Sequence, residues 1–189
     1  MLIGVLALQG AFREHLEKIE DCGAEGREIR KPEHLRGIEA LIIPGGESTT
    51  IGRLLVEFEL MEPVRGLGQE GMPIFGTCAG MVLLAKEIVG SDQPRLALME
   101  TIVRRNAFGR QVDSFEAFLE VPLLGQDPFR GVFIRAPYVE KVGPPAEVLS
   151  TFEGKIVAVR QGKLLATAFH PELTDDLRFH RYFLSLVED

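Results

Sequence analysis

The chain of 189 residues has few cysteines and no long hydrophobic run. Its two cysteines, Cys22 and Cys78, are too few for a disulfide framework and are typical of a reducing compartment. The longest uncharged run, Gly71–Ala85, is broken by glycines and a proline and is too short to span a membrane. Met1 leads directly into LIGVLAL without a basic segment, so no secretory signal is expected. These absences predict a cytoplasmic protein that does not associate with membranes.

Motifs for phosphates, dinucleotides and metals are also missing. No Lys-Ser or Lys-Thr follows the glycines of Pro44–Gly46 at P-loop spacing, and no Gly-x-Gly-x-x-Gly follows the first apolar run. Four scattered histidines and two distant cysteines make no metal-binding set. With 28 acidic against 21 basic residues, the net charge of −7 repels phosphate backbones. We therefore expect no metal and no nucleic-acid partner, and a small molecule as the substrate.

Length and composition are those of one globular domain. Apolar residues make up 46% of the chain and charged residues 26%, which excludes a disordered chain. A chain of this size can bury roughly 70% of its unfolded surface in a single core. Because we find no internal repeat, low-complexity segment or long linker, we expect one domain over residues 1–189.

In the first half, apolar runs alternate with segments of helical periodicity. The expected strands are Leu2–Leu8, a segment within Glu25–Arg30, Ala40–Ile43 and Met72–Phe75. The expected helices contain Phe12, Leu16 and Ile19, then Leu54, Leu55 and Phe58 after an N-cap at Ser48 or Thr49, and then Met81–Lys86. This alternation predicts a doubly wound α/β fold with a mainly parallel sheet.

The second half changes to short strands separated by turn pairs such as Glu153-Gly154 and Gln161-Gly162. The expected strands are Ala97–Val103, Phe115–Val121, Gly131–Ile134, Val148–Phe152, Ile156–Arg160 and Leu164–His170. Such turns indicate antiparallel additions to the sheet. A last helix is expected with Thr174 as its N-cap and an apolar face that includes Phe179 and Phe183.

The stretch Gly76-Thr77-Cys78-Ala79-Gly80 lies where a buried strand meets a helix. A nucleophile in such a tight turn adopts a strained backbone conformation, and small neighbours avoid steric clashes. The turn places Cys78 near a helix N-terminus, which favours the thiolate over the thiol. A buried cysteine chosen only for packing is the alternative interpretation of this motif alone.

His170-Pro171-Glu172 lies at the end of the last expected strand. A thiol nucleophile needs a base to accept its proton and a third group to orient that base. Cys78 and His170 both fall at the ends of expected strands, where a sheet can bring them together. We interpret the other three histidines, His15, His34 and His180, as structural residues.

A glycine loop, Pro44-Gly45-Gly46-Glu47-Ser48, also follows an expected strand. Glycines let backbone amides approach a substrate, and an amide directed at a developing oxyanion stabilises the transition state. Taken alone, the loop fits a phosphate site equally well.

Together these three motifs resemble the class I, or triad, glutamine amidotransferase domain, which is a three-layer α/β fold. Longer blocks are similar to the glutaminase subunits of two-component pyridoxal 5′-phosphate synthases. These blocks are LALQGAFREH, PGGESTTIGRLL, GTCAGMVLLAKEIVG, RRNAFGRQVDSFEA, VFIRAPYV and AFHPELTDD. They extend from residue 6 to residue 176.

The resemblance implies a glutamine hydrolase with Cys78 as nucleophile, His170 as proton shuttle and Glu172 as the group that orients His170. It further implies that six residues contact L-glutamine: Gly46, Glu47, Ser48, Arg105, Ile134 and Arg135. A guanidinium group suits the α-carboxylate of glutamine, which supports the two arginines. Backbone amides at Gly46 and Ala79 are the candidates for an oxyanion hole.

The resemblance also implies a hetero-oligomeric partner, the synthase (lyase) subunit, which receives ammonia and builds pyridoxal 5′-phosphate. No cofactor is expected in this subunit. Such glutaminases are activated by docking, and partner contact could reorient the Gly45–Gly46 peptide. Gln9 and Gly10 are the candidate docking residues.

Three alternatives stay open from the sequence. The chain could serve another ammonia-using enzyme, such as one that forms imidazole glycerol phosphate. It could be a stand-alone cysteine hydrolase or peptidase on a related scaffold. It could also be a non-catalytic binding subunit, although the presence of Cys78, His170 and Glu172 argues against this.

Overall fold

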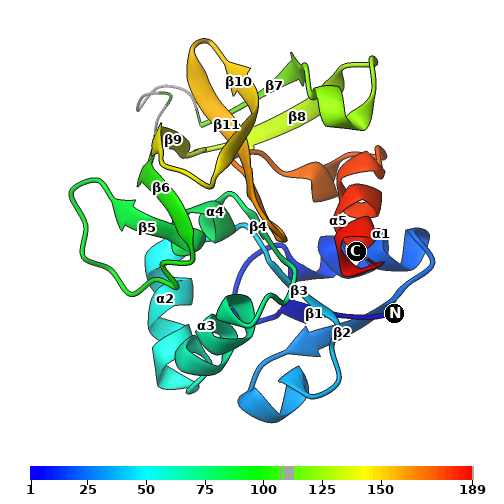
Figure 1. Ribbon diagram of the computed structural model, residues 1–189, viewed down its shortest axis with the longest axis vertical. Helices are drawn as coiled ribbons and strands as arrows, with labels where there is room; N and C mark the ends of the chain where they lie inside the picture. The colour runs from blue at the N-terminus through cyan, green and yellow to red at the C-terminus, as the bar shows by residue number, and fades with distance from the viewer. Residues whose placement is uncertain (107, 109–112, 189) are drawn as a thin grey trace.

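The centre of the molecule is a mixed β-sheet with helices on both of its faces (Figure 1). The structure, a computed structural model, describes residues 1–106, 108 and 113–188. Within these residues the elements are β1 (Leu2–Leu6), α1 (Phe12–Asp21), β2 (Glu25–Ile29), a 3₁₀ turn (Pro32–Leu35), β3 (Ala40–Ile43), α2 (Ser48–Glu57), α3 (Met61–Gln69), β4 (Ile74–Thr77), α4 (Ala79–Leu84), β5 (Ala85–Ile88), β6 (Met99–Arg104), β7 (Ser114–Leu119), a 3₁₀ turn (Pro122–Leu124), β8 (Phe129–Ile134), β9 (Tyr138–Val142), β10 (Glu147–Phe152), β11 (Lys155–Gln161), β12 (Leu164–Thr167), a 3₁₀ turn (Pro171–Leu173) and α5 (Arg178–Glu188).

The large sheet has a parallel half and a mainly antiparallel half. Its strand order is β2-β1-β3-β4-β12-β11-β9-β6-β5, and β10 also pairs with β11. Strands β2 to β12 in this order are parallel, whereas β11 runs antiparallel to β12, β10 and β9. Strands β7 and β8 form a separate antiparallel pair. The α/β fold with a mainly parallel sheet and antiparallel additions is therefore confirmed.

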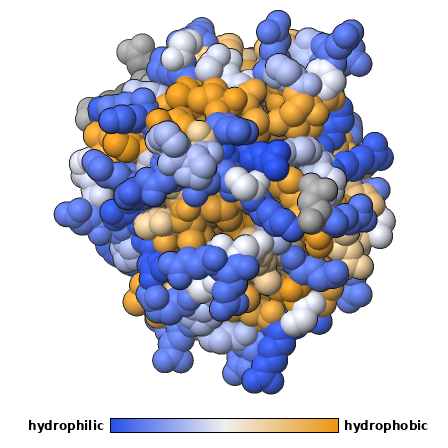
Figure 2. Space-filling model, viewed as in Figure 1, coloured by the Kyte–Doolittle hydropathy of each residue, from blue (hydrophilic) through white to orange (hydrophobic). Residues whose placement is uncertain are grey.

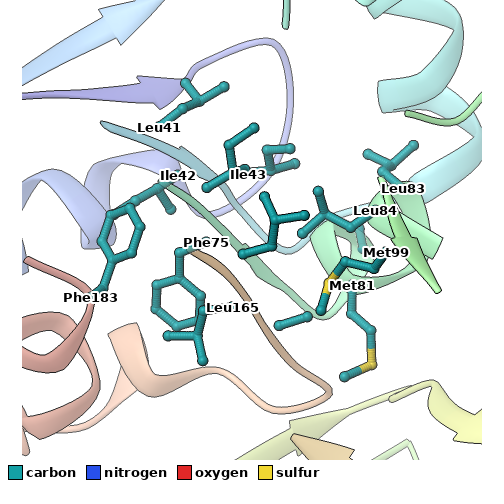
Figure 3. Packing of buried hydrophobic residues seen from close by; sticks show 14 of the residues in the cluster. Leu41, Ile42, Ile43, Phe75, Met81, Leu83, Leu84, Met99, Leu165 and Phe183 are labelled. Carbon is teal, nitrogen blue, oxygen red and sulfur yellow. The ribbon is translucent and has the colours of Figure 1, made fainter. Parts of the chain in front are cut away.

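The strands in the middle of the parallel half are buried on both faces. Every residue of β3, β4 and β12 is buried, as expected for continuous apolar strands that carry helices on either side. Figure 3 shows Leu41–Ile43 of β3, Phe75 of β4 and Leu165 of β12 packed in one apolar cluster. This core holds the parallel strands in place and so determines where the loops at their carboxyl ends begin.

Helices α1 and α5 cover one face of the parallel strands, and α2 and α3 cover the other (Figure 1). From α5, Phe179 and Phe183 are fully buried, and the Phe183 ring centroid lies 5.5 Å from that of Phe75. Burial of a phenylalanine side chain contributes about 1.5–3 kcal/mol, so these contacts attach α5 firmly to the sheet. The same packing brings His180 of α5 next to His15 of α1.

The surface seen in Figure 2 carries hydrophilic side chains around its edge and apolar patches between them. In the described part of the chain, no helix has both the length and the apolar character needed to cross a membrane.

The structure corrects the helix expected over Met81–Lys86. The helix α4 covers Ala79–Leu84, and the chain then extends at once into β5, which pairs in parallel with β6. Leu83 and Leu84 are fully buried, so an apolar run of this length was compatible with either structure.

Both predicted helix caps were wrong. Glu47, not Ser48 or Thr49, caps α2, because its carboxylate accepts the N–H groups of Thr49 and Thr50 at 3.3 and 2.8 Å. The last helix begins at Arg178, whose N–H donates to the Asp176 carboxylate at 3.0 Å.

Besides β5, the helix α3 and the strand β9 were not predicted, and several predicted strands were too long or too short. Strand β1 ends at Leu6, β12 ends at Thr167, and β8 begins at Phe129. Strand β2 is confirmed, with all five residues paired to β1.

Candidate active site

Cys78 occupies a sharp turn between β4 and α4. Its backbone angles, φ +49° and ψ −98°, belong to a region that residues with side chains rarely adopt. Its N–H donates to the carbonyl oxygen of Thr167 at 2.8 Å, which fastens the turn to β12. A Cβ on Gly80 would lie 2.2 Å from the Ile43 carbonyl oxygen, so α4 approaches β3 this closely only with glycine there. The thiol is thus held at the carboxyl ends of the parallel strands.

His170 leaves the sheet beside Cys78 because β12 and β4 are parallel neighbours in register, with Thr167 opposite Thr77. Pro171 then starts a 3₁₀ turn that carries Glu172 back beneath the imidazole. His170 Nδ1 and Glu172 Oε1 are 2.7 Å apart. With the carboxylate as acceptor, Nδ1–H donates, and Nε2 is left for exchange of a proton with the thiol.

The environment of His170 favours its protonated form. Burial lowers the pKa of the imidazole, but hydrogen bonds with Cys78 and Glu172 outweigh burial and raise it to about 10. Glu172 is almost fully buried. Burial raises its pKa, whereas its contacts with His15 and His170 lower it, and the net pKa is below the ordinary value. The pair can therefore hold an imidazolium next to the thiol.

The glycine loop after β3 packs directly against this pair. A Cβ on Gly45 would lie 2.3 Å from Cε1 of His170, so a side chain there would displace the ring. Three hydrogen bonds hold the loop. The Gly45 N–H donates to Thr77 Oγ1 at 3.1 Å, the Ala11 N–H donates to the Gly45 carbonyl at 3.0 Å, and the Glu47 N–H donates to Gln9 Oε1 at 2.8 Å.

A cavity of about 310 Å³ opens above the thiol. Its lining residues are Gln9, Gly46, Glu47, Ser48, Cys78, Ala79, Val82, Arg105, Asn106, Ile134, Arg135, Pro137 and His170. Every predicted substrate-contact residue and both oxyanion-hole candidates therefore lie on one cavity. Glu172 lies outside it, buried behind His170, and Gly10 lies against the Gly45 carbonyl.

Two arginines, Arg105 and Arg135, line the cavity and bring positive charge to it. Arg105 Nη1 donates to Gln93 Oε1 at 3.0 Å and to Thr49 Oγ1 at 3.1 Å, which fixes its position. Arg135 has a positive φ of 42°, and its N–H donates to the Asp113 carbonyl at 2.7 Å. The cavity can thus hold a small molecule with a carboxylate at the arginines and an acyl carbon near the thiol.

The thiol also has a neighbour across the cavity. Cys78 Sγ lies 3.8 Å from the backbone carbonyl oxygen of Ile134 at the end of β8. As the first residue of α4, Ala79 has an N–H without an acceptor inside the helix, as an oxyanion site requires.

Sequence analysis missed several residues that the fold brings to the site: Val82, Gln93, Asn106 and Pro137, and behind the triad Thr77, His15 and His180. One signal was available for His15, since it lies on the apolar face of the helix with Ile19 four residues later. Gln93 carried no local signal. Residues 107 and 109–112 of the block RRNAFGRQVDSFEA lie outside the described residues.

Among the residues with described positions, no three His, Cys, Asp or Glu side chains are grouped as they would be to hold a metal ion.

Comparison with known proteins gives a consistent result. A family model described as the SNO glutamine amidotransferase family matches residues 5–189. The chain is 68% identical to the "Pyridoxal 5′-phosphate synthase subunit PdxT" of Moorella thermoacetica, over 99% of this chain and 100% of the relative. It is 66% identical to the protein of the same name from Pelotomaculum thermopropionicum, over 97% and 94% of the two chains. A solved structure described as "Crystal structure of glutamine amidotransferase" superposes with a TM-score of 0.93 at 57% identity, covering 99% of both chains.

Proposed function

This chain belongs to the SNO glutamine amidotransferase family, and from that premise we propose that it hydrolyses L-glutamine as the glutaminase subunit of a pyridoxal 5′-phosphate synthase. The observation that carries the proposal is the arrangement at the cavity floor. The strained Cys78 lies beside His170, and His170 is hydrogen-bonded to the buried Glu172. A thiol, a base and a group that orients the base are the parts that nucleophilic attack on an amide needs.

The reaction begins with proton transfer from the thiol to His170. The thiolate of Cys78 attacks the side-chain amide carbon of glutamine, and the carbonyl electrons move onto oxygen. The N–H groups of Gly46 and Ala79 stabilise this oxyanion. As the C–N bond breaks, His170 returns its proton to the departing nitrogen, ammonia leaves, and a γ-glutamyl thioester remains. Water, deprotonated by His170, then attacks the thioester carbon, the C–S bond breaks, glutamate is released, and His170 returns the proton to the Cys78 thiolate.

Substrate recognition follows from the walls of the cavity. Arg105 and Arg135 bind the α-carboxylate of glutamine, and Gly46, Glu47 and Ser48 contact the rest of the molecule from the loop. Ile134 borders the reacting end, with its carbonyl oxygen 3.8 Å from the thiol. The Glu47 carboxylate also caps α2, which keeps the loop and the helix together.

Ammonia from this site is passed to the synthase subunit in a hetero-oligomeric complex. Gln9 and Gly10 form part of the docking edge. Gln9 bonds the Glu47 N–H, and Gly10 lies against the Gly45 carbonyl, so contact at this edge can change the glycine loop. Docking would activate hydrolysis by setting the Gly45–Gly46 peptide in the orientation that completes the oxyanion hole.

The chemistry requires only a thiol, an imidazole and water, so this subunit needs no metal and no cofactor of its own. A cytoplasmic location suits a protein whose two cysteines, Cys22 and Cys78, are both free and whose reaction depends on a reduced thiol.

Transfer of isotopic nitrogen tests the proposal. The chain is mixed with the synthase subunit, a pentose phosphate, a triose phosphate and glutamine labelled with ¹⁵N in its side-chain amide. The label is expected in pyridoxal 5′-phosphate with the wild-type chain, and only added ammonium salt should support synthesis with Cys78→Ala. Glutamate formation without labelled product would show a glutaminase that serves another enzyme, and mixing with an imidazole glycerol phosphate synthase subunit would test that alternative.

A further inference from the structure

Two buried polar atoms, one in the triad and one near it, have no hydrogen-bond partner among the described residues: Oε2 of Glu172 and Nδ1 of His180. Between them lies His15, whose side chain is completely buried. A buried carboxylate oxygen without a donor is costly, so an orphan in the triad itself needs a physical explanation.

His15 connects the two ends of this group. Its Nε2 lies 3.1 Å from Thr77 Oγ1 and 3.4 Å from Glu172 Oε2, and its Nδ1 lies 3.0 Å from Nε2 of His180. Burial lowers the pKa of both His15 and His180, so both rings are neutral. Each ring therefore has one N–H, and only two arrangements of the shared proton are possible.

In the first arrangement, His180 Nε2–H donates to His15 Nδ1, and His15 Nε2–H points to Thr77 Oγ1 and Glu172 Oε2. In the second, His15 Nδ1–H donates to His180, and the lone pair on His15 Nε2 accepts from the Thr77 hydroxyl but also faces the carboxylate of Glu172. The second also leaves an N–H of His180 buried without an acceptor. Both features are unfavourable, so the first arrangement is preferred.

We propose that His15, with its tautomer set by His180, is a positioning residue for the triad: its Nε2–H group supports the second oxygen of Glu172 while the first oxygen holds His170. Catalytic hydrogen bonds are often long in the free enzyme and tighten when charge develops. The 3.4 Å contact shortens as His170 becomes an imidazolium, and it keeps the carboxylate ionised and aligned.

Thr77 extends this support to the glycine loop. The same Oγ1 that contacts His15 accepts the Gly45 N–H at 3.1 Å. The charged and titratable groups that act on the cluster from its neighbours are Cys78 from the start of α4, and Glu14 and Lys18 from α1. His15 itself contacts both Glu172 of the triad and Thr77, the residue that holds the loop.

The inference rests on the proposed glutaminase function, and its test uses a measurement that does not need glutamine. In a Cys22→Ala background, the rate at which iodoacetamide alkylates Cys78 reports how well the thiolate–imidazolium pair is held. His15→Leu removes the donor, whereas His15→Gln restores an amide N–H near the position of Nε2. His34→Leu, in the 3₁₀ turn after β2, is the matched control for loss of a histidine.

We expect His15→Leu to slow alkylation at neutral pH and, in the complex with the synthase subunit, to lower kcat by about 10- to 100-fold with KM nearly unchanged. The alkaline limb of the kcat profile should move to lower pH, because the imidazolium is less stabilised. His15→Gln should recover most of the lost alkylation rate and kcat. His180→Leu should reduce both quantities less than His15→Leu does, and His34→Leu should have the values of the parent.

The inference would be overturned if His15→Leu folds and keeps the alkylation rate, kcat and pH profile of the parent. It would also be overturned if His15→Gln has an alkylation rate and kcat no higher than those of His15→Leu. If His15→Leu does not fold, His15→Gln and His180→Leu decide the question. The inference would then be overturned if His180→Leu keeps the wild-type kcat and pH profile while His15→Gln loses kcat. Altered alkylation in a chain that hydrolyses no glutamine would support the His15 network and reject the glutaminase proposal.

Discussion

At the residue scale, the charge of Glu172 is the feature that most distinguishes this site from a cysteine that is merely buried. The buried carboxylate accepts a short hydrogen bond from His170 and has its pKa lowered by its neighbours despite burial. It therefore fixes the tautomer of His170 and stabilises the imidazolium. Removal of the charge alone, with the shape kept, tests this directly.

Glu172→Gln is expected to lower kcat for glutamine by about 10²- to 10⁴-fold, because the amide no longer stabilises the imidazolium but the thiol and loop remain. Steady-state ammonia release measures the effect. Glu57→Gln, at the exposed end of α2, is the control and should keep wild-type kcat. Equal activity of Glu172→Gln and the wild type would refute the assigned role of this carboxylate.

Gly10 is a second informative residue, because it has a positive φ of 99° and its missing Cβ would lie 1.9 Å from the Gly45 carbonyl oxygen. Gly10→Ala should displace the glycine loop and lower kcat by at least about 10-fold, since small misplacements near reacting atoms are costly. Gly23 also has a positive φ, of 82°, but open space lies where its Cβ would be. Gly23→Ala should therefore lower stability without lowering activity. Parallel kinetics and thermal unfolding separate the two effects. Matching kcat values in both variants would contradict the role given to the loop.

At the element scale, the motifs at the ends of strands were predictable from the sequence. Which helices pack against each other was not. Cys78 and His170 follow strands whose apolar runs are visible in the sequence, and parallel strands end at one edge. His15 and His180 are 165 residues apart and meet only because α1 and α5 pack on the same face. Likewise, α4 and β5 form one apolar run, in which pairing with β6 decides where the helix ends.

The contact between α4 and β3 gives a prediction at this scale. Gly80→Ala should force α4 away from the Ile43 carbonyl, move Cys78, and reduce both stability and activity. Gly66→Ala, in α3 with open space around it, should raise stability by up to about 1 kcal/mol and leave activity unchanged. Calorimetric Tm and glutaminase rates provide the comparison. An active, stable Gly80→Ala would show that this close packing does not hold the nucleophile.

At the scale of the whole molecule, the buried histidines predict how stability depends on pH. Burial lowers the pKa of His15 and His180, so below the ordinary value of 6.5 the unfolded chain binds more protons and the free energy of unfolding falls. His170 acts in the opposite sense. Its pKa is raised to about 10, so its contribution is complete below 6.5 and is lost as pH rises through about 10.

Stability should therefore be greatest near neutral pH and decline on both sides. Tm measured across the pH range checks this, and His180→Leu should flatten the decline that begins below 6.5. A decline that begins only below 4.5, the ordinary value from which the pKa of Glu172 is lowered, would contradict neutral buried histidines.

Most of the candidate site was predictable because its residues sit in three local motifs, and resemblance to a family supplied the arginines. What the sequence could not supply is the fixed position of Arg105, which depends on Gln93 from the segment between β5 and β6. Such contacts are set by how whole layers pack, not by spacing along the chain.

The central claim is that the Cys78 thiol hydrolyses glutamine, and ammonia release from L-glutamine tests it most directly. The chain is assayed alone and with the synthase subunit, as wild type, Cys78→Ala and the matched thiol control Cys22→Ala. The account predicts release that rises on mixing, persists in Cys22→Ala, and falls by about a million-fold in Cys78→Ala. Release by Cys78→Ala at the wild-type rate would contradict it.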